Sequence, residues 1–179
     1  MEEVFRTAPD RGYRLCVGVA LFSADGRIFL GKRAQRGVVP QYSWQMPQGG
    51  IDKGEAPLAA AKRELYEETS VRTVTVVDEI DGWLHYDLPT DVANWRGRYR
   101  GQAQRWFAFR FDGSEEEINV KAPPDGHTVE FSRWRWEALS EVPGVVVPFK
   151  RAVYEAVVRA FSKYADNPDG LRTAPHLSI

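Results

Sequence analysis

Three glutamates, Glu64, Glu67 and Glu68, lie in a segment with the pattern of an amphipathic helix. Pro57 opens the segment, and proline suits the first helical position because its missing N–H does no harm there. At about 100° per residue, the three glutamates share roughly one quadrant of the helix. The neighbouring quadrant is apolar and can be buried: Leu58, Ala61 and Leu65. Because like charges at this spacing cost roughly 0.2–0.5 kcal/mol per pair, we expect something to compensate for them.

Carboxylates on a rigid helix suit a hard divalent cation, and Mg²⁺ takes a few of them together with waters and substrate phosphates. The alternative for a generic Glu-Glu pair is a solvated acidic face. A solvated face, however, leaves the preceding glycine-rich loop, the single Glu55 and Arg63 unexplained. The sequence therefore predicts a divalent-metal site on this helix.

The run from Gly49 to Val71 resembles the signature box of the Nudix pyrophosphohydrolases. It reads glycine, five residues, glutamate, seven residues and then Arg-Glu-Leu-x-Glu-Glu, with Val71 at the closing aliphatic position. Ser70 is one departure, because the family usually has glycine there. That glycine ends the helix in a left-handed turn, which serine adopts less readily. The metal ligands lie upstream, so Ser70 bears on local stability more than on chemistry.

Segments outside the box are similar to one Nudix branch, the bacterial RNA pyrophosphohydrolases, also described as dinucleoside polyphosphate hydrolases. The similarity covers about residues 12–164 and is carried by residues 12–14, 44–48, 83–89, 101–107, 130–136 and 148–151. The resemblance implies an α/β fold, namely an α/β/α sandwich with a mixed β-sheet. The order of the expected elements, with strands first and helices between and after them, agrees with that architecture.

A chain of 179 residues is expected to form one domain, here over residues 12–164, between flexible segments at 1–11 and 165–179. Strand-like runs cover residues 15–22, 28–32, 74–80, 83–86, 104–111 and 128–136, and Asp25-Gly26 is a hairpin signal. Helices are expected over about 57–69 and along an apolar stripe from Phe149 to Tyr164. Residues 166–179 are rich in Pro, Gly and Asn and are expected to fray.

Composition favours a cytoplasmic protein without a membrane segment. No apolar run approaches the ~20 residues that cross a bilayer, and the acidic start is not a secretory signal. The single cysteine, Cys16, lies in an apolar run and is expected to be a buried strand thiol. With a net charge of −1, the chain has no overall positive charge that would attract nucleic acid.

Arginines interleave with aromatic residues between positions 95 and 106. Arginine pairs with phosphates while aromatic rings stack on bases, so this segment is a candidate RNA contact. The alternative is an exposed loop and strand whose aromatics, Trp106, Phe107 and Phe109, alternate into the core. The sequence does not decide between the two interpretations for Arg96, Arg98 and Arg100.

The residue-by-residue match implies Glu64, Glu67, Glu68 and the Gly49 carbonyl as metal ligands, with Mg²⁺ as the ion and Mn²⁺ able to substitute. Arg63 would orient a neighbouring glutamate such as Glu67, one turn away; the alternative is an ordinary surface ion pair worth under about 1 kcal/mol. The catalytic base is open and can lie outside the box. Glu130 is the outside candidate, since the matching glutamate in this branch is implicated in metal binding; otherwise it is a solvated strand residue.

The resemblance also implies substrate contacts. Arg14, Arg33 and Lys150 match positions that look like phosphate ligands, and arginine suits bidentate phosphate pairing. Tyr86 and Phe149 are candidates for base stacking, although Phe149 also fits core packing. Further polar or titratable residues are weaker candidates: Gln48 and Gln104 for polar contacts, and His85 and His127, which are expected at the surface.

The implied reaction is attack of water on a phosphorus of a diphosphate bridge. Three functions stay open: an RNA 5′-pyrophosphohydrolase, a hydrolase of dinucleoside polyphosphates, and an inactive domain that only binds nucleotide or RNA. The third is disfavoured, because binding alone needs no intact carboxylate set such as Glu55, Glu64, Glu67 and Glu68. The expected partner is a nucleotide or RNA 5′-end, and no protein partner follows from the sequence.

Overall fold

A mixed sheet with helices on both faces organises the computed structural model, which describes residues 12–34, 39–89 and 99–174. At its centre β1 (Tyr13–Phe22) pairs in parallel with β7 (Gly101–Phe111), from Tyr13 opposite Gly101 to Phe22 opposite Arg110. Around this pair the sheet runs in the order β3-β2-β1-β7-β5, with β4 also paired to β1, β6 to β7 and β8 to β2. The remaining strands are β2 (Ile28–Arg33), β3 (Trp44–Gln45), β4 (Gln48–Gly50), β5 (Val74–Glu79), β6 (Leu84–Asp87) and β8 (Phe131–Glu137).

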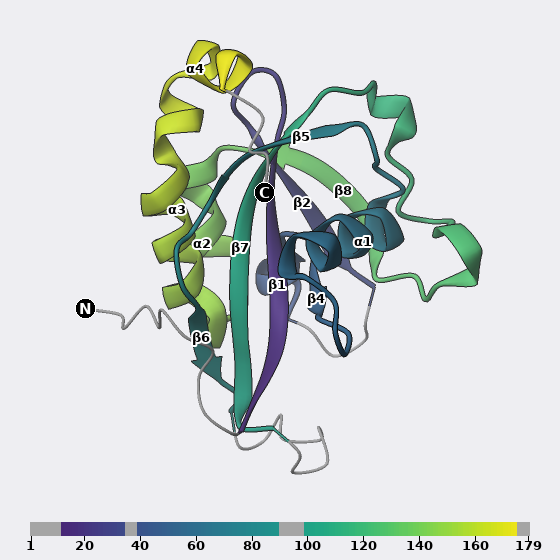
Figure 1. Cartoon of the computed structure of the whole chain (residues 1–179), viewed down its shortest axis with the longest axis vertical. Helices are drawn as coiled ribbons and strands as arrows, with labels where there is room; N and C mark the ends of the chain where they lie inside the picture. The colour runs from purple at the N-terminus through teal and green to yellow at the C-terminus, as the bar shows by residue number, and fades with distance from the viewer. Residues whose placement is uncertain (1–11, 35–38, 90–98, 175–179) are drawn as a thin grey trace.

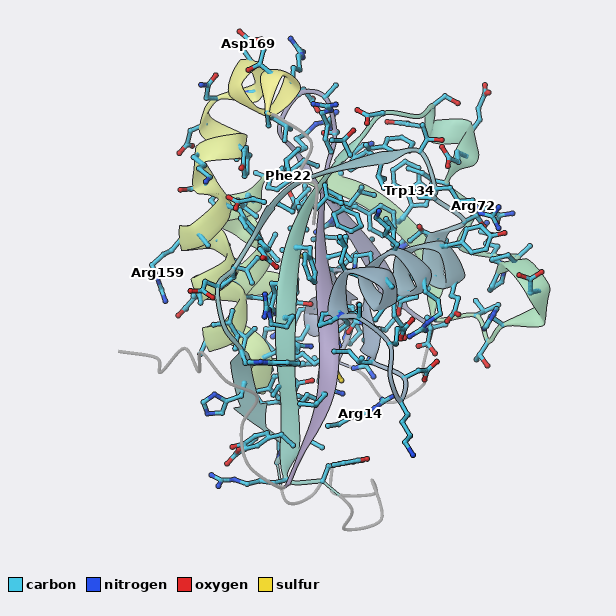
Figure 2. All side chains as sticks on the ribbon, viewed as in Figure 1. Arg14, Phe22, Arg72, Trp134, Arg159 and Asp169 are labelled. Atoms are coloured by element: carbon cyan, nitrogen blue, oxygen red, sulfur yellow. The ribbon has the colours of Figure 1, made fainter. Side chains whose placement is uncertain are left out.

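The two faces of the sheet are covered by different helices. Helix α1 (Pro57–Thr69) lies on one side of β1 and β7, whereas α2 (Val142–Val145) and α3 (Arg151–Asp166) lie on the other (Figure 1). Side chains fill both interfaces, and Arg159 and Asp169 point outward from α3 and from α4 (Pro168–Thr173) (Figure 2). The α/β/α sandwich with a mixed sheet expected from the resemblance is therefore confirmed.

Two hydrophobic clusters hold these layers together. The α1 side buries Ala60, Ala61 and Leu65 against the sheet. On the opposite side, the apolar stripe of α3 is buried against the sheet: Val153, Tyr154, Val157, Phe161 and Tyr164. Each fully buried Val, Leu or Phe side chain contributes roughly 1.5–3 kcal/mol, so the amphipathic patterns account for where the helices dock.

Helix α1 has the bounds expected from its sequence, and its end explains the unusual serine. Ser70 adopts the left-handed conformation, with φ 66°, and its N–H donates to the Tyr66 carbonyl at 2.8 Å. The Ser70 hydroxyl donates to the Asn119 carbonyl at 3.1 Å. The serine thus occupies the turn normally taken by glycine, and its side chain ties the turn to a neighbouring loop.

The interior placements expected from the sequence are also found. Trp106, Phe107 and Phe109 are buried, as the core interpretation required. Cys16 is buried as well, and burial raises the pKa of its thiol to about 11. None of the helices in the described residues combines the length and the apolar character that crossing a bilayer requires.

The structure differs from the sequence expectation at the end of the chain. Residues 168–173 form helix α4 (Pro168–Thr173), with Leu171 fully buried, where a frayed tail was expected. Arg110 supports this helix, because its Nη1 atom donates to the carbonyls of Leu171 and Arg172 at 3.1 and 2.9 Å. A buried leucine and a guanidinium from β7 outweigh the helix-breaking composition. The segment 1–11 lies outside the described residues, so its flexibility stays a prediction.

Candidate active site

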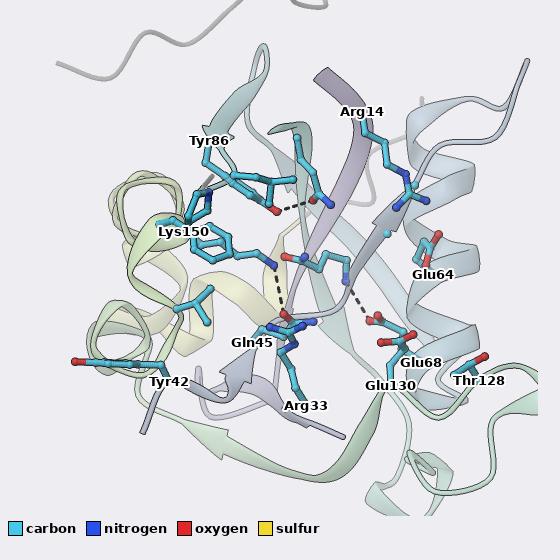
Figure 3. Close-up of a pocket in the computed structure, with 18 of the residues that line it drawn as sticks. Arg14, Arg33, Tyr42, Gln45, Glu64, Glu68, Tyr86, Thr128, Glu130 and Lys150 are labelled. Carbon is cyan, nitrogen blue, oxygen red and sulfur yellow. Dashed lines mark hydrogen bonds between the residues drawn. The ribbon is translucent and has the colours of Figure 1, made fainter. Parts of the chain in front are cut away.

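A cavity of about 1010 Å³ opens between α1, the sheet and the turn that precedes α3. It brings together residues from the whole length of the chain (Figure 3). Glu64, Glu68 and Glu130 lie on one side, and Lys150 and Tyr86 on the other. Every predicted metal or substrate residue lines this cavity: Arg14, Arg33, Gly49, Glu64, Glu67, Glu68, Tyr86, Glu130, Phe149 and Lys150.

The acidic side, which we call the carboxylate wall, consists of Glu64, Glu67 and Glu68 on α1 together with Glu130 just before β8. Glu68 is buried, and its Oε2 atom accepts a hydrogen bond from the Gln48 backbone N–H at 3.1 Å. Burial raises the pKa of Glu68 well above its usual value, and the charges of Glu64 and Glu130 act in the same direction. Burial also raises the pKa of Glu64, against the opposing effect of Arg63. A bound cation would therefore favour the charged forms of these buried carboxylates.

Gly49 and Gly50 in β4 let two charged side chains approach the backbone closely. A Cβ at Gly49 would collide with the Glu64 carboxylate, and a Cβ at Gly50 would collide with the Arg14 guanidinium. Successive strand residues face opposite sides, so the two glycines admit a carboxylate on one side and a guanidinium on the other. The backbone of β4 thereby lies in contact with both charged groups.

Arg63 connects the loop before α1 to the carboxylate wall. Its Nε and Nη2 atoms each donate to the Glu55 carboxylate at 2.8 Å, and Nη2 also donates to the Gly50 carbonyl at 2.8 Å. Nη1 donates to Glu64 at 2.9 Å and to Glu67 at 3.3 Å. This network involves more partners than the ordinary ion pair that was the alternative. Arg63 does not line the cavity and reaches the wall through its bonds to Glu64 and Glu67.

The carboxylate wall has the donor chemistry of a divalent-cation site. Its side chains are all oxygen donors, and the glycine at position 49 leaves room for the Glu64 carboxylate beside the backbone. Within the described residues, no three His, Cys, Asp or Glu side chains are arranged to hold an ion by themselves. Mg²⁺ does not demand such a cage, because it is usually bound by one or two carboxylates with waters and substrate phosphates. The residues present thus fit this cation.

The basic side of the cavity contains Lys150 and Arg33, whereas Arg14 lies beside Glu64 on the opposite side (Figure 3). Lys150 is buried, and its Nζ atom donates to Gln45 Oε1 at 3.4 Å. Burial, together with the neighbouring Arg33 charge, lowers the pKa of Lys150 to about 7. A buried ammonium beside an arginine is a site at which an anion relieves repulsion.

An aromatic pair borders the basic side. The rings of Tyr86 and Phe149 lie 5.6 Å apart between centroids, and the Lys150 ammonium lies 5.6 Å from the Tyr86 ring centre. Phe149 belongs to a 3₁₀ turn, Pro148–Lys150, rather than to α3 itself. It both lines the cavity and packs against the core, so the two interpretations of Phe149 are compatible.

Other candidates from the sequence lie elsewhere. Arg96 and Arg98 fall outside the described residues, and Arg100 pairs with Asp87 at 2.7 Å. Gln104 is fully buried and does not line the cavity. His85 packs against the Tyr13 ring on the sheet.

Several cavity residues were not assigned from the sequence. His127 is exposed at the surface, as expected, and it also lines the cavity, with its Nε2 atom 3.7 Å from Glu67 Oε1. Gln45 and Gln102 also line the cavity. The sequence could have indicated Gln102, because Gln102 and Gln104 are polar residues two apart on one face of a mostly apolar strand. His127 lies in a loop, where no periodic pattern marks an inward side chain.

Comparison with known proteins agrees with this geometry. A family model described as the NUDIX domain matches residues 12–157. An RNA pyrophosphohydrolase from Bradyrhizobium diazoefficiens is 55% identical over 161 residues, covering 88% of this chain and 96% of the relative. An RNA pyrophosphohydrolase from Agrobacterium fabrum is 53% identical over 161 residues, covering 86% and 94%.

Solved structures with the same fold have much lower sequence identity. The E. coli dihydroneopterin triphosphate pyrophosphohydrolase has a TM-score of 0.60 at 18% identity, covering 84% of this chain and 99% of the other. A C. elegans Ap4A hydrolase has a TM-score of 0.58 at 16% identity, covering 84% and 98%. These structures share the fold alone, whereas the family model and the relatives above 50% identity establish that the chain belongs to the Nudix hydrolase family.

Proposed function

We propose that the chain is an RNA pyrophosphohydrolase that removes pyrophosphate from the 5′-triphosphate end of RNA. The observation that carries the proposal is the polarised cavity, with a carboxylate wall facing a basic and aromatic side. Such a cavity suits a nucleotide whose oligophosphate reaches a metal-bearing helix. The curated relatives that match most of the chain bear the name RNA pyrophosphohydrolase, which favours RNA among such substrates. A cytoplasmic location stays a prediction from the sequence.

Glu64, Glu67 and Glu68, with the Gly49 carbonyl and Glu130, would hold Mg²⁺, and Mn²⁺ is expected to substitute. When bound, the ion supplies charge neutralisation at the phosphate oxygens and lowers the pKa of a coordinated water. Phosphoryl transfer depends mainly on positioning and electrostatic stabilisation.

The remaining steps belong to side chains of the protein. Arg14, Arg33 and Lys150 bind the oligophosphate, and Tyr86 and Phe149 pack against the nucleotide. One carboxylate of the wall accepts a proton from the attacking water, and the candidates are Glu64, Glu67 and Glu130. Arg63 holds Glu64 and Glu67 in place.

Dinucleoside polyphosphates are the second candidate substrates, because they too present a nucleotide with an oligophosphate. The aromatic pair and the basic side of the cavity fit this class as well. An inactive binding domain stays disfavoured, since the carboxylate set is intact and gathered at one cavity.

The proposal is tested with a short RNA that carries a 5′-triphosphate with labelled β- and γ-phosphates. With Mg²⁺ the protein should release the label and leave 5′-monophosphate RNA of unchanged length. EDTA should abolish the reaction, and added Mg²⁺ or Mn²⁺ should restore it. Retention of the label under conditions in which the protein is folded would refute the proposal.

A further inference from the structure

Three glutamines line the cavity, and each has its side-chain oxygen turned toward a donor of the protein. Gln45 Oε1 faces the Lys150 ammonium at 3.4 Å. Gln48 Oε1 faces Gln104 Nε2 at 3.5 Å and the Tyr154 hydroxyl at 3.4 Å. Gln102 Oε1 faces Gln104 Nε2 at 3.4 Å and the Tyr86 hydroxyl at 2.7 Å. We call Gln45, Gln48 and Gln102 the amide floor.

A buried indole sets the direction of the first hydrogen bonds. Trp106 and Gln104 are fully buried, and Trp106 Nε1 donates to Gln104 Oε1 at 3.1 Å. An indole N–H can only donate, so it fixes the amide of Gln104 with its oxygen toward Trp106. The Gln104 NH₂ group then points to Gln48 and Gln102 and donates to both oxygens.

The backbone N–H of Met46 sets the direction of the hydrogen bond between Tyr154 and Gln48. The Met46 N–H donates to the Tyr154 hydroxyl oxygen at 3.2 Å, so the Tyr154 proton goes to Gln48 Oε1. The Gln48 amide is thereby oriented from two sides. Burial raises the pKa of Tyr86 well above its usual value, while a hydrogen bond from Gln48 acts in the opposite direction, as a donor does. The Gln48 NH₂ group has two hydrogens, so one remains for a ligand.

We infer that Gln45, Gln48 and Gln102 present NH₂ groups to the cavity and donate to the oxygens of a linear oligophosphate, an assignment of ligand that rests on the function proposed above. Gln104 and Trp106 are positioning residues, because their hydrogen bonds orient the amide groups of the floor. Because the amide oxygens already accept hydrogen bonds from the protein, the floor meets a ligand mainly as a donor. A ligand without acceptor oxygens would leave buried donors unpaired, so the floor selects for oxyanions.

The direct test measures binding of inorganic tripolyphosphate in EDTA by calorimetry. Gln48→Met and Gln102→Met keep side-chain length and remove the donor, and each should weaken binding about 3–10-fold, the range expected for the net contribution of one ordinary hydrogen bond. Gln41→Met is the matched control, because Gln41 is exposed on the 3₁₀ turn Pro40–Tyr42 and does not line the cavity. It should bind like the wild-type protein.

A double-mutant cycle tests the positioning role. Gln104→Met should weaken tripolyphosphate binding by itself, but should have no further effect in a Gln48→Met/Gln102→Met background. A purely structural effect of Gln104 would persist in that background.

The inference is overturned if Gln48→Met and Gln102→Met bind tripolyphosphate as tightly as Gln41→Met, or if the wild-type protein does not bind it. These outcomes do not depend on RNA turnover. Glutamine-dependent binding without turnover of triphosphate RNA would refute the proposed function and leave the amide floor intact.

Discussion

Glu67 is the residue at which the metal-site assignment is tested most simply. Its side chain is 21% exposed and contacts Arg63, so it contributes little to the core. Glu67→Gln keeps size and shape but removes a charge that a cation needs. We expect turnover to fall at least ~10²-fold, or about 2.7 kcal/mol of transition-state stabilisation, with an unchanged melting temperature. More than half of the wild-type turnover at saturating Mg²⁺ would show that Glu67 is not a required ligand.

Lys150 should make substrate affinity depend on pH. Its pKa is about 7 in the folded protein because burial disfavours the charge. Phosphate binding needs the ammonium, so KM for triphosphate RNA should rise by up to about tenfold per pH unit above pH 7. Lys150→Met should start with a higher KM and lose this part of the pH dependence. The same pH profile in both proteins would contradict the role.

The same pKa has a consequence for stability. The unfolded chain holds this proton up to about pH 10.4, whereas the folded protein releases it near pH 7. Between these values the unfolded state binds more protons, so through this group the free energy of unfolding rises with pH. Lys150→Met should remove that rise, which denaturant unfolding at pH 7 and pH 9 would measure.

At the scale of elements, the end of α1 combines strain with a compensating contact. Ser70 has φ 66°, a conformation that costs a non-glycine residue about 1–3 kcal/mol. Ser70→Val should lower the free energy of unfolding by a similar amount, because a β-branched side chain suits this region least. Ser70→Gly should stay within about 1 kcal/mol of the wild type, since relief of strain offsets a more flexible unfolded chain and the lost Asn119 contact. Equal stability of the Val and Gly variants in urea would contradict this account.

The elements that the sequence predicted best are those with a long periodic pattern. Helix α1 has the expected bounds, and β1, β2, β5 and β7 lie within a few residues of theirs. The short strands β3 and β4 were not predicted, because two or three residues are too few to show a period. Helix α4 was missed since it depends on a distant guanidinium, that of Arg110.

The site was predictable to the extent that a motif or matched position marked its residues. The motif spacing lies within a single helix for Glu64, Glu67 and Glu68, and the structure places all three on one wall of the cavity. His127 and the amide floor reach the same cavity through tertiary packing, which has no local signal. The hydrogen-bond directions of Gln48 and Gln102 depend on Trp106 and Met46, which only the fold brings near.

At the scale of the whole molecule, function depends on separating charges within a nearly neutral chain. The net charge is −1, yet the cavity gathers the carboxylates with Arg14 on one side and Lys150 with Arg33 on the other. This separation is what an oligophosphate with a divalent cation requires. It does not by itself distinguish an RNA end from a dinucleoside polyphosphate.

The most direct test of the central claim is a side-by-side measurement of kcat/KM for 5′-triphosphate RNA and diadenosine tetraphosphate, with the same enzyme and Mg²⁺ concentration. Glu67→Gln serves as the control for contaminating hydrolases and should be inactive on both. We predict a higher kcat/KM for triphosphate RNA, with 5′-monophosphate RNA as the product. A higher kcat/KM for diadenosine tetraphosphate, or no conversion of triphosphate RNA, would contradict the account.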